Sequence, residues 1–317
     1  FGVHFVDALK GVAAGGNSFQ GVLYTTNDGG LTWTPTPPGR YPNTTFMGVQ
    51  FVNASEGWIC GLNGVLLRTF DGGTSWVTQN SGTSEDLWEV FFQSSLNGWI
   101  VGDFGTILYT NNGGATWVRQ NAGSNTLFHV YFASANEGWT VGEFGTIFHT
   151  VDSGNSWTPQ SDGKSYTLYD FHLATAAEGW AVGTSGTIMH TTNGGQTWEF
   201  QQSNTRNSLF SVDFVSLTEG WVVGDLGLIL HTVDGGKTWI PQISGTGSTF
   251  FGIDFVDNKK GWAVGFDFDT ETSIVLRTQN GGSTWNSQAI NDAALVNLFF
   301  VNAPRGWAVG IDSGGNG

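Results

Sequence analysis

The chain has 317 residues, a mass of 34.0 kDa and a formal net charge of −15, because 26 acidic side chains face only 11 Lys and Arg residues. A charge this negative argues against a nucleic-acid-binding protein, which needs a basic patch for phosphates, and against adhesion to an anionic membrane surface. No apolar run approaches the ~20 residues of a membrane-spanning helix. The single cysteine, Cys60, excludes a disulfide within the chain, and we interpret it as a small buried hydrophobic residue.

One motif repeats along almost the whole sequence. The Asp-box, T-x-[DN]-x-G-x-[ST]-W, occurs seven times, and its closing tryptophans lie 43, 41, 40, 41, 41 and 46 residues apart. A second motif, G-W-x-x-G, recurs between the Asp-boxes, with a weaker copy, GVAAG, in the first repeat. A stretch of the form F-x-V-x-F precedes each copy. A fixed period of this length indicates a propeller or a solenoid, and the two-residue alternation of apolar residues indicates strands.

Each repeat therefore predicts four short strands, named here a (F-x-V-x-F), b (G-W-x-V-G), c (T-I-x-x-T) and d (T-W-x-x-Q). The Asp-box forms the hairpin between c and d, where Asp or Asn accepts backbone N–H groups and glycines supply positive φ. One such sheet cannot bury both of its faces, so the sheets should pack radially. The predicted fold class is all-β, a β-propeller of four-stranded antiparallel blades.

Seven repeats are complete, and an eighth begins without strands c and d, so we favour seven blades and keep eight as the alternative. We expect a single domain, 1–317. Its units should span 1–40, 46–80, 87–121, 127–160, 167–201, 209–243 and 250–289, with a partial unit at 295–317. Because Phe1 already begins a strand, we expect the start of this sequence to be processed or truncated.

The repeat resembles known families. Asp-boxes, also called bacterial neuraminidase repeats, occur in sialidases, sortilin-type receptors and xyloglucanases. The fuller unit, GWAVGxxGTIxxTxDGGxTW, looks like the photosystem II stability and assembly factor family of seven-bladed propellers and its secreted bacterial relatives. That resemblance implies an arginine-rich patch that contacts the photosystem. This chain departs from it, because its six arginines fall in different units: Arg40, Arg68, Arg119, Arg206, Arg277 and Arg305.

Most aromatic and imidazole side chains are expected to be structural. Of 15 tryptophans, 14 occupy the two repeat positions, which indicates a core rather than a sugar-binding platform; the exception, Trp88, should also pack. His149, His190 and His231 share one strand-c position, but neighbouring blades should hold them too far apart for one metal ion. Non-core positions of strand a should line the central channel: His4, Gln50, Glu89, His129, Asp170, His172, Asp213 and Asp254.

Long b–c connections predict where a partner binds. They belong to units 1, 7 and 8, which become neighbours when the ring closes, on the face shared with the d–a loops. The candidate binding face is formed by Phe19, Arg40, Tyr41, Phe266, Asp267, Phe268, Asp269 and Glu271. The alternating carboxylates of Asp267, Asp269 and Glu271 are weak candidates for a calcium site; otherwise we expect no metal and no cofactor.

The sequence lacks the motifs of common enzymes. It contains no G-x-S-x-G elbow, no H-E-x-x-H and no phosphate loop, so we predict no catalytic residues and no enzymatic activity. The predicted function is a non-enzymatic extracytoplasmic scaffold that binds a protein or glycan, as a module of a larger surface or fibre-forming protein. One alternative is a lumenal or periplasmic assembly factor for a photosystem-like membrane complex, and another is an Asp-box glycoside hydrolase. The expected location is secreted, cell-surface, periplasmic or thylakoid-lumenal.

Overall fold

The computed structural model describes residues 2–7, 9–17, 20–37, 39–160, 165–290, 293–302 and 305–312. Within these ranges the regular structure is β-strand, apart from four short 3-10 turns. None of the helical turns found there has the length or apolar character needed to cross a membrane. The residues group into two compact units, one reaching to Pro159 and the other starting at Gln160.

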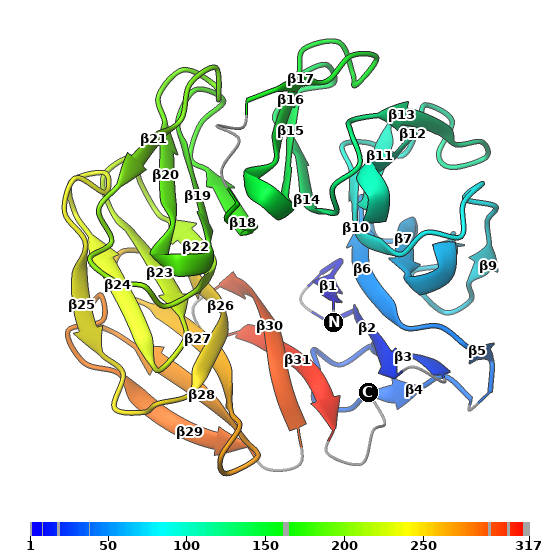
Figure 1. Cartoon of the computed structure of the whole chain (residues 1–317). Coiled ribbons are helices and arrows are strands. Elements are labelled where there is room, and N and C mark those ends of the chain that lie inside the picture. Colours follow the sequence, from blue (N-terminus) through cyan, green and yellow to red (C-terminus); the bar gives the residue numbers. More distant parts are fainter. Residues whose placement is uncertain are drawn as a thin grey trace. The chain divides into compact units, whose positions relative to one another are not determined.

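The first unit contains four successive antiparallel sheets, coloured blue to green in Figure 1. We call each sheet a blade and number the blades in chain order. The strands of blades 1 to 4 and their 3-10 turns are β1 (Gly2–Phe5), β2 (Gly11–Asn17), β3 (Gln20–Thr26), β4 (Thr34–Pro35), β5 (Tyr41–Pro42); β6 (Phe46–Phe51), β7 (Gly57–Gly61), η1 (Leu62–Gly64), β8 (Leu66–Thr69), β9 (Val77–Thr78); β10 (Leu87–Phe92), β11 (Gly98–Gly102), η2 (Asp103–Gly105), β12 (Thr106–Thr110), β13 (Val118–Asn121); and β14 (Leu127–Phe132), β15 (Gly138–Gly142), η3 (Glu143–Gly145), β16 (Ile147–Thr150), β17 (Thr158–Pro159).

The second unit contains three four-stranded blades and one two-stranded sheet. These elements are β18 (Leu168–Leu173), β19 (Gly179–Gly183), η4 (Thr184–Gly186), β20 (Ile188–Thr191), β21 (Glu199–Gln201); β22 (Leu209–Phe214), β23 (Gly220–Gly224), β24 (Leu228–Thr232), β25 (Ile240–Ile243); β26 (Thr249–Phe255), β27 (Gly261–Asp267), β28 (Thr272–Thr278), β29 (Asn286–Ile290); and β30 (Ala293–Asn302), β31 (Arg305–Asp312).

The predicted fold class is confirmed: the chain is all-β, with seven four-stranded antiparallel blades. In each blade the order of the strands is a-b-c-d, as the repeat predicts. Loops also share faces as expected. The b–c turn of blade 3 binds the d–a loop before its own strand a, with Asp103 N donating to Asp86 O at 2.9 Å. The Asp-box of the same blade binds the a–b loop, where Gly113 N donates to Leu96 O at 2.9 Å.

The Asp-box hairpin is held by its own side chains, as blade 6 illustrates. Thr232 Oγ1 accepts a hydrogen bond from Gly236 N at 2.8 Å and donates one to Asp234 Oδ1 at 2.9 Å. Asp234 in turn accepts from Thr238 N at 2.9 Å and from Thr238 Oγ1 at 2.7 Å. Gly235 and Gly236 have φ angles of 75° and 81°, where a side chain would be strained. The turn therefore favours Asp or Asn followed by glycines, although Ser153 takes the first of these positions in blade 4 with a φ of 62°.

Adjacent blades are joined by stacked aromatic rings. The strand-b tryptophan of one blade lies flat on the strand-a phenylalanine of the next, with ring centroids 3.6 Å apart for both Trp180–Phe214 and Trp221–Phe255. The same phenylalanine receives the Asp-box tryptophan of its own blade edge-on, at 5.9 Å for Phe255–Trp285. Equivalent stacks join Trp58 to Phe92, Trp99 to Phe132 and Trp262 to Phe300.

Burial confirms that the strand-b tryptophans form the core. Trp58, Trp99, Trp139, Trp180 and Trp221 have no exposed surface. Asp-box tryptophans lie nearer the rim and are buried or half-buried.

Trp88 is half-buried and packs as expected, but it has a polar contact as well. Its ring lies 5.6 Å from Phe128 of the next blade, and its Nε1 donates to Asp103 at 2.7 Å.

Replacing Trp221 by Ala should lower the free energy of unfolding by about 3–5 kcal/mol, because it removes a fully buried ring and the stack on Phe255. Urea denaturation at neutral pH would measure the loss. Val233→Ala, at an exposed Asp-box position, is the control and should change the stability by less than about 0.5 kcal/mol. Equal effects from the two substitutions would contradict the role of the stack.

Candidate functional site

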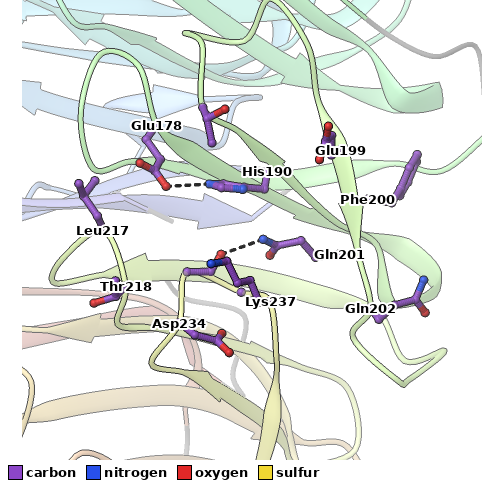
Figure 2. Close-up of a pocket in the computed structure, with 13 residues that line it drawn as sticks. Glu178, His190, Glu199, Phe200, Gln201, Gln202, Leu217, Thr218, Asp234 and Lys237 are labelled. Carbon is purple, nitrogen blue, oxygen red and sulfur yellow. Dashed lines mark hydrogen bonds and ion pairs between the residues drawn. The ribbon is translucent and has the colours of Figure 1, made fainter.

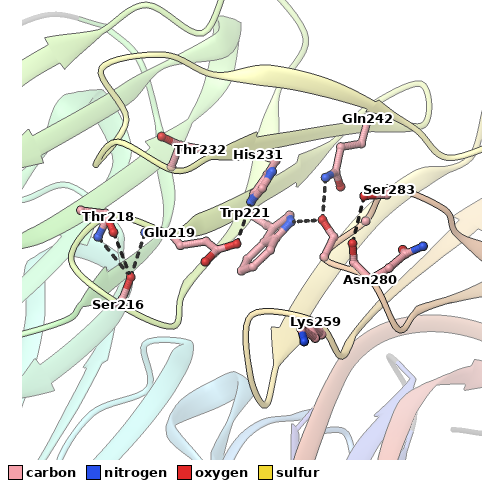
Figure 3. Close-up of polar contacts among 12 residues, drawn as sticks. Ser216, Thr218, Glu219, Trp221, His231, Thr232, Gln242, Lys259, Asn280 and Ser283 are labelled. Carbon is pink, nitrogen blue, oxygen red and sulfur yellow. Dashed lines mark hydrogen bonds and ion pairs between the residues drawn. The ribbon is translucent and has the colours of Figure 1, made fainter.

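The strand-c histidines are placed by their own blades. His190 lies opposite Trp180 in the β19–β20 pairing, and the two rings stack at a centroid distance of 4.6 Å. Glu178, just before strand b, contacts a ring nitrogen of the imidazole, with 3.0 Å between its Oε1 and His190 Nε2. His231 repeats this arrangement with Trp221 and Glu219, as Figure 3 shows. Burial lowers the pKa of His231, although the Glu219 contact opposes this shift.

Other residues fill the same slot in other blades. Arg68 lies 5.0 Å from the ring centre of Trp58 and 3.4 Å from Glu56, so it replaces His as the cation between a ring and a carboxylate. Arg277 lies over Trp262 at 5.6 Å. Two of the six arginines are thus part of blade packing. Each occupies the strand-c position of its own blade, so they lie in different repeats of the sequence.

In several blades a glutamine near the start of strand d joins the blade to the Asp-box of the next. Gln201 Nε2 donates to Gly235 O at 2.8 Å, and Gln201 Oε1 accepts from Trp239 Nε1 at 3.1 Å. Gly235 O also accepts from Trp180 Nε1 at 3.3 Å. We call the contact of the glutamine with the glycine carbonyl and the Asp-box tryptophan, here Gln201 with Gly235 and Trp239, the glutamine clasp. Gln242 forms it with Gly281 and Trp285 at distances of 2.8 and 3.1 Å.

The clasp is also the floor of a groove between blades 5 and 6. Figure 2 shows this groove, which has a volume of about 780 Å³. One wall comes from the Glu178–His190 pair and strand β21, and the other from the Asp-box tip of blade 6. The lining residues are Glu178, His190, Thr192, Glu199, Phe200, Gln201, Gln202, Leu217, Thr218, Asp234, Gly235, Gly236 and Lys237.

An equivalent groove of about 500 Å³ lies between blades 6 and 7. Glu219, His231 and Gln242 take the places that Glu178, His190 and Gln201 have in the first groove (Figure 3). Its outer wall carries Lys259 and Asn280. The groove between blades 5 and 6 is more acidic, with three carboxylates and one lysine, Lys237, in its lining. Both grooves are polar and open, which suits a polypeptide segment with cationic or amide side chains better than an apolar small molecule.

Carboxylates of strand a tie one blade to the next, while their predicted place along the channel stays a prediction. Asp170 accepts a hydrogen bond from Val212 N at 3.0 Å, and Asp213 accepts one from Phe255 N at 2.7 Å. Asp254 and Glu89 do the same for Phe300 N and Val130 N, at 2.9 and 2.6 Å. Strand a is the inner edge of its blade, so its free N–H groups need acceptors from outside the sheet. These side chains supply the acceptors.

The tie at Asp213 has an unusual charge state. Burial, together with the nearby charge of Asp254, raises the pKa of Asp213 to about 7. Its Oδ1 lies 3.4 Å from Nδ1 of His172, whose pKa is lowered by burial. Asp170 is the other charge that acts on both groups. Burial thus favours the uncharged form of each member of the pair.

The predicted binding face is only partly described. Phe19 lies outside the described residues. Arg40 Nε donates to Tyr41 Oη at 3.0 Å, and Tyr41 packs edge-on against Phe46 at 5.2 Å. The segment that contains Arg40 and Tyr41 includes strand β5, which pairs with β3 of blade 1. Tyr41 is therefore half-buried and contributes to packing.

The long b–c connection predicted in unit 7 is an extended hairpin. Strands β27 and β28 continue pairing through Phe266↔Ser273 and Asp267↔Thr272. Asp267 Oδ1 caps the turn by accepting from Asp269 N and Thr270 N, both at 3.0 Å. These bonds hold the pKa of Asp267 below its usual value. Phe268 is 67% exposed and meets Phe266 edge-on at 5.1 Å.

The two parts of the predicted face belong to different compact units, so their union in one surface stays a prediction. The calcium site suggested by Asp267, Asp269 and Glu271 also stays a prediction. Cys60 is fully buried and burial raises its thiol pKa, which confirms its interpretation as a small core residue.

Sequence reasoning missed both inter-blade contacts. The glutamine clasp leaves a sequence signal, because Gln follows the Asp-box tryptophan by three residues in six of the seven repeats: Gln79, Gln120, Gln160, Gln201, Gln242 and Gln288. The strand-a carboxylates leave a weaker signal, because two alternate positions share the task. Glu89 and Asp170 occupy the earlier position, and Asp213 and Asp254 the later one.

Structural comparison defines the class of protein. The computationally designed Ika8 protein aligns with a TM-score of 0.74 at 13% identity over 99% of this chain and 93% of that chain. YCF48 from Cyanidioschyzon merolae aligns with a TM-score of 0.68 at 20% identity, covering 88% and 95%. YCF48 bound to a D1 peptide aligns with a TM-score of 0.67 at 23% identity, covering 84% and 89%. With the blades described above, these likenesses define a β-propeller.

The sequence profile of the photosynthesis system II assembly factor YCF48 family matches residues 1–81, 74–163 and 160–244. The chain belongs to this family. The resemblance inferred from the repeat is therefore confirmed, and the assembly-factor alternative gains over a generic scaffold. No individually curated protein matches the sequence closely enough to count as a relative.

Replacing Asp213 by Asn should change how stability depends on pH. The folded-state pKa of about 7 exceeds the unfolded value of 3.8, so the folded state holds the proton more tightly between these values. This contribution is fully present below the unfolded pKa and is lost as pH rises through the folded pKa. Wild type should therefore lose stability relative to Asp213→Asn between pH 4.5 and pH 8, as urea titrations would measure.

Asp234→Asn is the matched control, because its Asp-box hydrogen bonds from Thr238 lower the carboxyl pKa. Here wild type should lose stability relative to the variant only as pH falls below about 4. A pH-independent difference between wild type and Asp213→Asn would contradict the raised pKa.

Proposed function

We propose that this chain is a non-enzymatic assembly factor that binds an extended segment of a partner protein outside the cytoplasm. Its membership of the YCF48 family and the D1 peptide bound to one solved YCF48 support this proposal. The observation that carries it is the groove of about 780 Å³ between blades 5 and 6. Rigid strands and a hydrogen-bonded hairpin build its walls, so the groove is formed before any partner arrives.

The chemistry of the groove indicates what kind of segment fits. Glu199 is exposed on β21 opposite His190, and Asp234 lies across the groove on the Asp-box. A Lys or Arg side chain between the walls would be attracted by both carboxylates, while Gln202 and Thr218 offer hydrogen bonds to a peptide backbone. We therefore propose a cationic segment as the ligand.

The proposed binding function needs no catalytic residues. The Glu178–His190 pair resembles part of a proton-transfer system, but the imidazole is stacked flat on Trp180 and belongs to the blade packing. The glycoside hydrolase alternative would give hydrolysis of an oligosaccharide. We expect no turnover with xyloglucan or sialosides under conditions in which the peptide binds.

A second surface deserves the same test because of one observation. Phe268 exposes 67% of its surface at the tip of the β27–β28 hairpin, beside Asp269 and Glu271. Apolar rings at a rigid hairpin tip are typical of protein contacts. If the inserted loops bind the partner, substitutions at this tip and not in the groove will weaken binding.

The charge reversal Glu199→Lys should weaken binding of a Lys- or Arg-containing D1 peptide at least tenfold in isothermal titration calorimetry at 50 mM salt, because it replaces attraction by repulsion. Glu271→Lys is the matched control: it makes the same charge change at the inserted hairpin and should change the affinity less than threefold. Raising the salt concentration should reduce wild-type affinity and shrink the difference between the variants.

A larger loss of affinity in Glu271→Lys than in Glu199→Lys would indicate that the peptide binds at the β27–β28 hairpin and not in the groove. Absence of binding by any cationic peptide, with binding in a glycan array, would replace the protein partner by a glycan. Equal binding by wild type and both variants would remove charge as the basis of recognition. Fractionation of the native source should recover the protein outside the cytoplasm.

A further inference from the structure

Two aromatic residues of the first compact unit occupy b–c turns in a backbone conformation that bulky residues rarely adopt. Phe104 and Phe144 are the central residues of η2 and η3, with φ angles of 52° and 53°. Left-handed backbone of this kind suits Gly and Asn, and it strains a bulky side chain. Blade 2 carries Asn63 at the same position, so the turn itself does not require an aromatic ring.

Burial does not account for Phe104 either. It is 65% exposed, although the blades on its two sides, blades 2 and 4, belong to the same compact unit. Phe104 therefore strains the turn and contributes little to the core. A strained residue that is not explained by packing is a reason to look for a function at that position.

Trp88 lies beside this turn and extends the aromatic surface. It is half-buried near the start of β10, and its Nε1 donates to Oδ1 of Asp103, the residue before Phe104, at 2.7 Å. Its ring meets Phe128, at the equivalent position of β14, edge-on at 5.6 Å. A bulge at this position interrupts the pairing of strands a and b in both blades, and bulges commonly redirect a side chain.

The turn that carries Phe104 is held between the loops that precede and follow blade 3. Asp103 N donates to Asp86 O, and Gly105 N donates to Asn125 O, both at 2.9 Å. Asn125 Nδ2 also donates to Thr146 Oγ1 at 2.8 Å, which links the b–c turns of blades 3 and 4. Because the ring is presented by a hydrogen-bonded turn, a partner would not have to order a loop.

The charges near Phe104 and Trp88 are predominantly negative. Glu85 and Asp86 lie in the loop that the turn binds, and they and Asp103 are half-buried. A cation, Arg119, also reaches the turn, where its guanidinium donates to Phe104 O at 3.3 Å. Three carboxylates and one guanidinium leave an excess of negative charge, which attracts a cationic side chain.

We propose that Phe104, Trp88 and the carboxylate of Asp103 form a docking site for an extended segment of a partner protein that carries an arginine and an apolar residue. Arginine fits better than lysine, because its planar guanidinium stacks on an aromatic ring while it pairs with a carboxylate. The apolar residue would pack on the exposed ring of Phe104. A second copy of this chain is not the expected partner, since two chains with a net charge of −15 repel each other.

This site goes beyond the proposed function and does not rest on it. The groove between blades 5 and 6 belongs to the second compact unit and attracts lysine and arginine alike. The site at Phe104 belongs to the first compact unit and should distinguish the two cations. Either site can fail its test without the other.

The test uses the fluorescein-labelled peptide GSLSRSLSRSG, in which leucine and arginine two positions apart lie on one side of an extended chain. In fluorescence anisotropy at about 50 mM salt we expect saturable binding with a Kd below about 1 mM. Replacing both arginines by lysine should weaken binding at least threefold, and replacing them by uncharged citrulline should weaken it at least fivefold.

Phe104→Asn should weaken binding at least fivefold, while the melting temperature stays unchanged or rises because Asn suits the left-handed turn, as Asn63 does in blade 2. A purely structural residue would not separate these two readouts. Phe70→Asn is the matched control: it removes a 56% exposed ring from the Asp-box of blade 2 and should change the affinity less than twofold. Asp103→Asn retains an acceptor for Trp88 and should weaken binding at least threefold.

Hydrogen exchange locates the bound peptide. Backbone amides of 86–88 and 103–105 should exchange at least threefold more slowly in the complex. Protection elsewhere without protection of these two segments would overturn the proposal.

Other outcomes would also overturn it. They are the absence of saturable binding, unchanged affinity in both Phe104→Asn and Asp103→Asn, and a lowered melting temperature of Phe104→Asn. A loss of affinity in Glu199→Lys without a loss in Phe104→Asn would place the peptide in the groove, which supports the proposed function and removes this site. Binding of a neutral oligosaccharide that depends on Phe104 would assign the rings to a glycan, and a dimer that Phe104→Asn dissociates would assign them to a second copy.

Discussion

The stack of a strand-b tryptophan on the strand-a phenylalanine of the following blade is the contact on which the rest of the structure depends. At the two junctions among blades 5, 6 and 7 the ring centroids lie 3.6 Å apart, and the tryptophan is completely buried at both. A single blade offers these rings only an edge-on tryptophan or a histidine, and no flat phenylalanine–tryptophan stack. The large apolar area of these residues is removed from water only when successive blades meet, so the blades gain stability together.

The polar contacts follow from this stack. With the rings in register, the indole N–H of Trp180 points at Gly235 O, and Gln201 completes the clasp from the neighbouring strand. The groove between blades 5 and 6 lies over these groups, so its walls are fixed by packing rather than by the ligand. A binding surface on such a base loses little conformational entropy when a partner arrives. This favours recognition by the groove walls, with the exposed carboxylate of Glu199 as the variable element.

Sequence periodicity predicted what each blade does by itself, and it missed what blades do for one another. The strands, the Asp-box turn and the buried tryptophans all depend on residues within one repeat, so a 40-residue pattern shows them. The bond from Asp213 to Phe255 N links residues 42 positions apart and depends on the register between two sheets. Side-chain pattern alone does not reveal that register. Strand β5 and the long β27–β28 hairpin were missed because turn residues such as Pro, Asp and Thr mask the pairing of short strand ends.

The carboxylate ties also have a direction. Asp170, Asp213 and Asp254 each reach forward along the chain and none of them reaches back. Blades 6 and 7 thus each receive a carboxylate from the blade before them and offer one to the sheet after them. Such a polarity lets whole repeats be duplicated or deleted without redesigning a junction, since each new unit meets a surface that already fits it. The length of the gene, and not the chemistry of the contact, then sets how many units assemble.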